Sequence, residues 1–273
     1  MPPTSPRSGL PLSPGPLSSH PDSQTFQTDS LASLGDVGQE LPNLSSRRQA
    51  LPRAVIFDLD GTLIDTIDDI TAALNATLAS EGLPPVPANA VRNLVGNGAT
   101  VLIQEALFLH GRKGSPQHIQ ELKIRYVGQY SANPVTATTP FPFAVEVLEN
   151  LSDTGVALGV CTNKPLIPSQ LILKELGLSH LIGALIAPES GFGQKPDPKP
   201  LLACAERLGV SPDQTVYVGD HAVDVETARA AGIRVITVTF GYSTDMSHHA
   251  RADCCINSLD ELPSALLAVA AAP

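Results

Sequence analysis

The sequence predicts an α/β fold: a parallel sheet with helices on both faces, and an all-helical segment inserted after the first strand. From about residue 140 onward, short apolar runs alternate with stretches of helical periodicity, which is typical of a parallel sheet covered by helices. Residues 66–139 show helical spacing instead of strand patterns. With 273 residues, the chain suffices for one domain with a large insertion or for two modest domains.

The N-terminal segment is rich in Pro, Ser and Gly and poor in aromatic residues. It can bury too little apolar area to offset the entropy cost of ordering, so we expect it to be disordered. It lacks the features of a secretory signal, and its acidic residues argue against a transit peptide. A linker and an early translation start both remain open. We therefore divide the chain into a disordered tail (1–52), an α/β core (53–65 and 140–273) and a helical cap (66–139).

The first predicted strand is the apolar run 55–57, which leads into Asp58, Asp60 and Gly61. Alternate residues of a strand face the same side, so both carboxylates cluster where the strand ends. Two close carboxylates resist ionising together unless a cation lies between them, and a site of oxygen ligands suits Mg²⁺. The alternative is an ordinary Asp-Gly turn. We prefer the metal site because three further polar clusters follow apolar runs.

The inserted segment begins with a predicted helix over residues 67–78, with two acidic residues in its first turn. Gly82 and Pro84 end this helix. Helical patterns then continue over residues 86–130, with two apolar stripes: Leu102, Ala106 and Leu109, and Leu122, Tyr126 and Tyr130.

The alternation of strands and helices resumes after the insertion. Ligands of such parallel sheets bind beyond the carboxyl ends of the strands, where the remaining polar clusters lie. The predicted strands are 156–161, 181–187, 215–218 and 234–239, and the predicted helices are 144–151, 169–176, 198–208 and one ending at Gly232.

Three polar clusters follow these strands. Thr162, Asn163 and Lys164 can bind a phosphoryl oxygen, although Thr and Asn are also common at ordinary helix N-termini. Lys195 lies next to Pro196 and close to Pro198, a framing that restricts the backbone and favours a fixed cation over a solvated loop lysine. The last cluster contains Asp220, which can complete a metal site with Asp58, and Asp224, which can bond the loop or pair with Lys195. The alternative interpretation of this last cluster is an ordinary capped helix.

The four clusters together resemble the motifs of the haloacid dehalogenase superfamily of phosphohydrolases. Asp58–Thr62 is similar to the first motif, Thr162 to the second, Lys195 to the third, and Gly219–Asp220 with Asp224 to the fourth. The resemblance extends from about residue 54 to residue 242. It implies a Rossmann-like sheet and a cap domain inserted after the first motif.

The resemblance also implies roles for these residues. Asp58 is the nucleophile that forms an aspartyl-phosphate, and Asp60 is the acid and base. Mg²⁺ is held by Asp58, the backbone carbonyl of Asp60 and Asp220, with Asp224 supporting them. The phosphoryl group is bound by Gly61, Thr162, Asn163 and Lys195.

Within the superfamily, the sequence is most similar to bacterial phosphoglycolate phosphatases. Gly96, Asn97 and Gly98 resemble the cap signature of these phosphatases, although they also fit a plain turn between helices. The run Thr162–Lys164 is similar to the same family as well. Lys164 and the cap signature are therefore candidate substrate contacts. His221 departs from the pattern, since relatives carry a small hydroxyl residue there.

Other functions remain open alongside this prediction. The same motifs fit a phosphatase for another small ester, such as a sugar phosphate, nucleotide or pyrophosphate, or a phosphosugar mutase. A binding module without activity is disfavoured, because neither the nucleophile nor the metal aspartate is missing.

Composition limits the partners. The formal net charge of −10 argues against general nucleic-acid binding, and no apolar run is long enough to span a bilayer. Four cysteines without metal-binding spacing favour a reducing cytoplasm. We expect a small anionic substrate and a monomer or homodimer. His248 and His249 are expected to be a solvated surface pair.

Overall fold

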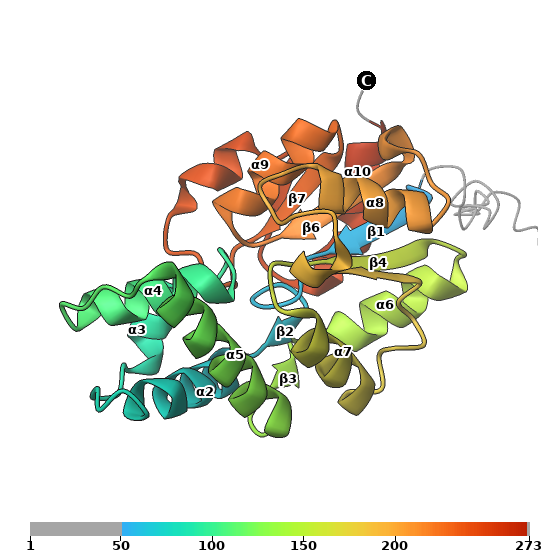
Figure 1. The fold of residues 1–273 in the computed structure, drawn as a ribbon. Coiled ribbons are helices and arrows are strands. Elements are labelled where there is room, and N and C mark those ends of the chain that lie inside the picture. Colours follow the sequence, from blue (N-terminus) through green and yellow to red (C-terminus); the bar gives the residue numbers. More distant parts are fainter. Residues whose placement is uncertain (1–50, 272–273) are drawn as a thin grey trace, which may run out of the picture. The chain divides into compact units, whose positions relative to one another are not determined.

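The computed structural model describes residues 51–271, so the predicted tail falls almost entirely outside the described residues. Within them, a six-stranded parallel sheet has the strand order β5-β4-β1-β6-β7-β8 (Figure 1). The predicted fold class is confirmed. The strands are β1 (Ala54–Phe57), β4 (Ala157–Cys161), β5 (Ala184–Ile186), β6 (Thr215–Gly219), β7 (Arg234–Val238) and β8 (Cys254–Ile256).

Helices cover both faces of the sheet, because the central strands are apolar on both sides. In β1, Val55 and Phe57 pack into one hydrophobic cluster and Ile56 into another. The first cluster includes residues of α6 (Ala144–Asp153), α7 (Leu166–Glu175) and α10 (Leu262–Ala271). The second includes residues of α8 (Lys199–Arg207) and α9 (Ala222–Ala231). None of the helices among residues 51–271 is long and apolar enough to cross a membrane.

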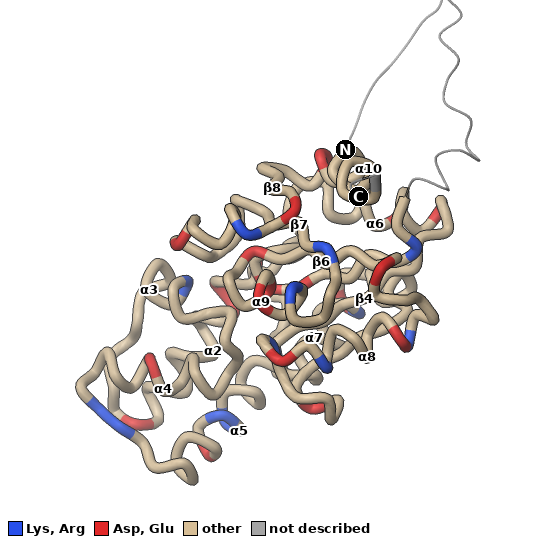
Figure 2. The backbone as a smooth tube through the Cα atoms, turned by 90° about the horizontal axis from the view of Figure 1, so that it is seen from above, with Lys and Arg blue, Asp and Glu red and all other residues tan. Residues whose placement is uncertain are grey.

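Four helices occupy the chain between β2 (Ile64–Asp65) and β3 (Thr139–Pro140), and they lie together beside the sheet (Figure 1). The segment leaves the core through β2 and returns through β3, and these two short strands pair with each other in antiparallel fashion. Figure 2 shows acidic and basic residues interspersed over these helices and those of the core. The inserted helices are α2 (Ile67–Ala79), α3 (Ala88–Arg92), α4 (Ala99–Leu109) and α5 (Pro116–Ala132).

Several local predictions were wrong. Leu109 is 54% exposed although Leu102 and Ala106 on the same stripe are buried, because Leu109 is the last residue of α4. The strand predicted over 181–187 shortens to β5, preceded by a turn. His248, expected in solvent, is 2% exposed and packs against the ring of His249. The strand pair β2–β3 and the strand β8 were not predicted, because strands of two or three residues are too short to show periodicity.

Candidate active site

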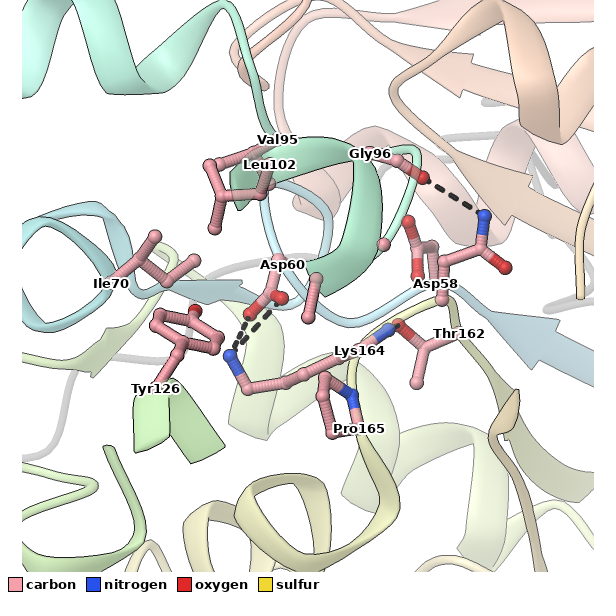
Figure 3. Close-up of a pocket in the computed structure, with 13 residues that line it drawn as sticks. Asp58, Asp60, Ile70, Val95, Gly96, Leu102, Tyr126, Thr162, Lys164 and Pro165 are labelled. Atoms are coloured by element: carbon pink, nitrogen blue, oxygen red, sulfur yellow. Dashed lines mark hydrogen bonds and ion pairs between the residues drawn. The ribbon is translucent and has the colours of Figure 1, made fainter. Parts of the chain in front are cut away.

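Three neighbouring strands of the sheet end beside one another, and each is followed directly by predicted site residues. Asp58 follows β1, Thr162 follows β4 and Asp220 follows β6. Because parallel strands present their carboxyl ends at one edge of the sheet, these three loops converge there. Figure 3 shows Asp58, Thr162 and Lys164 around one cavity.

Lys195 lies between two of the predicted carboxylates. Its Nζ is 3.0 Å from Asp58 Oδ1 and donates a 2.6 Å hydrogen bond to Asp224 Oδ1. The Tyr217 hydroxyl accepts a further bond from Lys195 at 2.9 Å. Burial alone would raise the pKa of Asp224, but the Lys195 ammonium group and the N–H of His221 hold that pKa below its usual range. Asp224 therefore fixes the ammonium group beside Asp58.

The Asp58 carboxyl group is buried in an environment that opposes its ionisation. Burial, followed by the charges of Asp224 and Asp220, raises its pKa to about 7, against the opposing effects of Lys195 and Thr162. Oδ1 of Asp58 lacks a well-aligned hydrogen bond within the described residues and has only the close approach of Lys195. A cation placed at this carboxyl would favour the ionised form.

Asp60 is held by residues of a different set. Lys164 Nζ donates to both carboxylate oxygens of Asp60, at 2.9 and 3.1 Å, and Thr66 Oγ1 donates to Oδ1 at 2.7 Å. The third donor position of Lys164 is taken by the Tyr130 hydroxyl of α5, at 2.8 Å. Burial lowers the pKa of Lys164, although the charge of Asp60 partly offsets this effect.

Asp220 is buried and is held by three neighbours. Its Oδ2 accepts the Tyr242 N–H at 2.7 Å and lies 2.9 Å from His221 Nδ1, while Thr62 Oγ1 donates to Oδ1 at 3.3 Å. Gly61 has φ +81°, and a Cβ there would lie 2.5 Å from Asp220 Oδ2, so the loop needs glycine at this position.

The carboxylates fit a hard divalent cation. Asp58 and Asp220 supply oxygen donors, and their mutual repulsion contributes to the raised pKa of Asp58. Asp220, His221 and Asp224 also form a compact cluster of potential metal ligands, with ligand atoms within 4.8 Å of one another. The oxygens of Asp224, however, already accept hydrogen bonds from Lys195, Tyr217 and two backbone N–H groups. Asp224 is therefore better placed to support the site than to bind the ion.

The glycine-rich loop of the inserted segment reaches this edge of the sheet. Asn163 Nδ2 donates to the carbonyls of Gly96 at 3.0 Å and Lys195 at 3.1 Å, and Asn163 Oδ1 accepts the Lys195 N–H at 2.9 Å. Asn163 thus joins three loops, and a phosphate contact from its side chain stays a prediction. Gly98 lines the cavity with Asn163, whereas Asn97 is exposed and faces a neighbouring hollow.

The cavity enclosed by these loops is small, with a volume of about 30 Å³. Its core side is polar, and its other side is an apolar wall from the inserted helices. Polar lining groups come from Asp58, Asp60, Thr162, Asn163 and Lys164, and the apolar wall comes from Ile70, Val95, Leu102 and Tyr126.

Sequence reasoning missed three residues that hold the site. Thr66 donates to Asp60, Tyr130 accepts from Lys164, and Tyr242 contacts Asp220 through its backbone. The Tyr242 hydroxyl also donates to Asp65 and accepts the Thr66 N–H. No motif in the sequence marks these residues. The partners of Tyr130 and Tyr242 are distant along the chain, and Thr66 lies six residues after Asp60, beyond the first motif.

Comparison with known proteins agrees with this arrangement. The family model described as haloacid dehalogenase-like hydrolase matches residues 55–238. A phosphoglycolate phosphatase of Rhodospirillum rubrum is 39% identical over 199 residues, covering 71% of this chain and 83% of that protein. An N-acetylmuramic acid 6-phosphate phosphatase of Pseudomonas aeruginosa is 34% identical over 212 residues, covering 77% of this chain and 92% of that protein.

A solved structure leads to the same family. The crystal structure of a protein described as a predicted phosphoglycolate phosphatase from Haemophilus somnus has a TM-score of 0.72 and 29% identity, covering 78% of this chain and 97% of its own. Fold, convergent motifs and sequence similarity therefore lead to one conclusion: the chain belongs to the haloacid dehalogenase-like hydrolases.

Proposed function

We propose that the protein is a Mg²⁺-dependent phosphomonoester hydrolase that converts 2-phosphoglycolate and water into glycolate and phosphate. The observation that carries the proposal is the buried Asp58 carboxyl with the Lys195 ammonium group 3.0 Å away, at the edge of the sheet where Thr162 and Asp220 also lie. The substrate is supported by the similarity to the phosphatase of Rhodospirillum rubrum.

In the first step, an oxygen of Asp58 attacks phosphorus and the bond from phosphorus to the glycolate oxygen breaks. Asp60 gives a proton to the departing oxygen. In the second step, Asp60 takes a proton from a water molecule that attacks the aspartyl-phosphate, which releases phosphate and restores Asp58. Lys195 and Thr162 bind the phosphoryl oxygens and stabilise their charge, with Gly61 and Asn163 shaping the loops around them.

Asp58, Asp220 and the backbone carbonyl of Asp60 would hold the Mg²⁺ ion. When bound, the ion neutralises charge on the phosphoryl oxygens and on the crowded carboxylates. The acidic surroundings of Asp58, which raise its pKa to about 7, are consistent with a site that gains from such an ion.

A sugar phosphate is the second candidate substrate, and the similarity to the Pseudomonas aeruginosa phosphatase favours it. A panel of phosphate monoesters, assayed with and without Mg²⁺, separates the two. We expect 2-phosphoglycolate to have the highest kcat/KM and chelation of the metal to abolish turnover. A preference for sugar phosphates or nucleotides would refute the proposed substrate.

Two substitutions test the proposed roles. Asp58→Asn should abolish turnover while the fold is kept, because an amide cannot form the aspartyl-phosphate. Asp60→Asn should lower kcat by roughly 10²- to 10⁴-fold, the usual contribution of an acid-base group. Rapid-quench detection of phosphorylated protein distinguishes the steps, and an active Asp58→Asn enzyme would contradict the mechanism.

We further propose that the enzyme works in the cytoplasm, as a monomer or homodimer. The four cysteines are unpaired in the structure, which suits a reducing compartment. Fractionation of cells and light scattering of the purified protein test these two statements.

A further inference from the structure

We infer that Lys164 recognises a negative charge at the end of the substrate that is not phosphorylated, and so selects short phosphate esters that carry a carboxylate. The inference rests on the proposed function and adds the residue that determines specificity. It starts from the side chains that surround the cavity beside Asp58.

Lys164 is the one cationic side chain among the described residues that line this cavity. The other buried lysine of the site, Lys195, is committed to Asp58 and Asp224 at the phosphoryl end. An anionic group attached to the far end of the substrate therefore meets Lys164 as its available positive partner. A lysine can bind a carboxylate through any of its three donors.

The hydrogen bonds of Lys164 allow this exchange. Two of its three donors converge on the same carboxylate, at 2.9 and 3.1 Å from the oxygens of Asp60 (Figure 3). A substrate carboxylate can replace one of them, because Asp60 also accepts a bond from Thr66. The third donor stays on the Tyr130 hydroxyl, which holds the lysine in place.

The remaining walls of the cavity oppose larger, hydroxyl-rich substrates. The side formed by the inserted helices is apolar, with Ile70, Val95, Leu102 and Tyr126. Buried hydroxyl groups of a sugar would lose hydrogen bonds to water there without replacing them. The geometry points to a short chain that ends in a charge.

Two esters of similar length test the inference on the unmodified enzyme: 2-phosphoglycolate and 2-hydroxyethyl phosphate, which replaces the carboxylate with an uncharged hydroxymethyl group. We expect kcat/KM to favour 2-phosphoglycolate by roughly 10- to 100-fold, the value of a hydrogen bond to a charged group. A wild-type enzyme that hydrolyses both esters equally would overturn the inference and leave the proposed phosphatase activity standing.

Variants then assign the preference to Lys164. In Lys164→Met, both rates fall because Asp60 loses a partner, but the ratio of the two kcat/KM values should approach one. Tyr130→Phe, which removes the hydroxyl that holds the lysine, should reduce the ratio in part, mainly through a higher KM for 2-phosphoglycolate. Lys174→Met, at an exposed lysine of α7, is the matched control and should keep the wild-type ratio.

The outcomes separate the two claims. A Lys164→Met enzyme that loses activity on both esters by the same factor would show that the lysine acts only on Asp60, and would overturn the inference alone. Lys164→Gln, which keeps a polar side chain, repeats the measurement if the methionine variant does not fold. Absence of hydrolysis for every phosphate ester in the presence of Mg²⁺ would overturn the proposed function and this inference with it.

Discussion

Two lysines form ion pairs with three of the four acidic side chains of the site. Lys195 lies against Asp58 and Asp224, and Lys164 lies against Asp60. Asp220 instead has a backbone N–H, a hydroxyl group and the His221 ring as neighbours. Among these four carboxylates, Asp220 is thus the one without a lysine beside it. It follows β6, next to the end of β1, where the metal is proposed to bind.

The raised pKa of Asp58 predicts how the metal-free protein responds to pH. Folding raises this pKa from 3.8 to about 7, so the protonated group favours the folded state. Its stabilising contribution is fully present below the unfolded value and is lost as the pH rises through the folded value. Without Mg²⁺, we therefore expect the melting temperature to fall between about pH 4 and about pH 7, and Mg²⁺ to raise it most above about pH 7.

Asp58→Asn provides the control, because the amide stays uncharged throughout. Its metal-free melting temperature should depend less on pH over this range and exceed that of the wild type at about pH 8. Identical pH curves for the two proteins would contradict the assigned pKa. His221 titrates in both proteins. Burial lowers its pKa, whereas the hydrogen bond and charge of Asp220 raise it, and the pKa is raised overall. The variant removes only the smaller contribution of the Asp58 charge.

Among the elements, the start of α2 has a structural role that the sequence did not reveal. Asp69 lies in its first turn and accepts hydrogen bonds from the backbone N–H groups of Thr136, Ala137 and Thr138 at 2.9 to 3.0 Å. The Thr138 hydroxyl donates to the same carboxylate at 2.7 Å. Asp69 thereby ties the first inserted helix to the segment that leads back into the core.

Asp69→Ala should destabilise the protein by roughly 1.5–3 kcal/mol, because it leaves these buried and partly buried donors without an acceptor. Burial alone would raise the pKa of Asp69, but the Thr138 hydroxyl and the backbone N–H groups lower it. Its contribution is therefore present above the unfolded pKa and is lost as the pH falls through the folded pKa. Chemical denaturation at neutral and acidic pH measures both effects.

Asp68→Ala is the matched control for this element, since Asp68 is an exposed carboxylate in the same turn. We expect a change within about 0.5 kcal/mol for Asp68→Ala. Equal losses for the two variants would show that the helix dipole, and not the bonds to residues 136–138, carries the effect of Asp69.

The elements found from the sequence are those with long apolar runs or periodic stripes, such as β1, β6 and α2. The motifs also placed Asp58 and Asp220, because each directly follows a strand whose apolar pattern is clear, and Lys195, because prolines frame it. The remaining site contacts could not be predicted, since Tyr242 and Thr66 are 176 residues apart and only the folded chain brings them together. Short pairs such as β2–β3 depend on the same long-range contacts.

For the described part of the chain as a whole, one hydrophobic cluster joins the inserted helices to the sheet. It contains Leu102 and Tyr126 of the insertion together with Val55 and Phe57 of β1. Residues linked through a continuous core lose their packing together, so local opening of the insertion exposes part of the shared cluster.

We therefore expect a single cooperative unfolding transition for this part of the protein, with the calorimetric enthalpy equal to the van't Hoff enthalpy. Differential scanning calorimetry of the full chain, with and without Mg²⁺, measures both enthalpies. Two resolved transitions in the calorimetric trace would contradict this expectation and show that the insertion unfolds by itself.

The paired strands β2 and β3 place the two ends of the helical insertion side by side. A segment whose ends already meet can be exchanged for another of different length without stretching the scaffold that bears it. Asp58, Lys195 and Asp220 all belong to that scaffold, whereas the apolar wall of the cavity belongs to the exchangeable segment. The apolar part of substrate selection is thus encoded in a stretch of sequence that is separable from the catalytic residues, whereas Lys164 stays with the scaffold. Grafting a foreign insertion at residues 65 and 139 is therefore a direct way to change the organic group that this catalyst accepts.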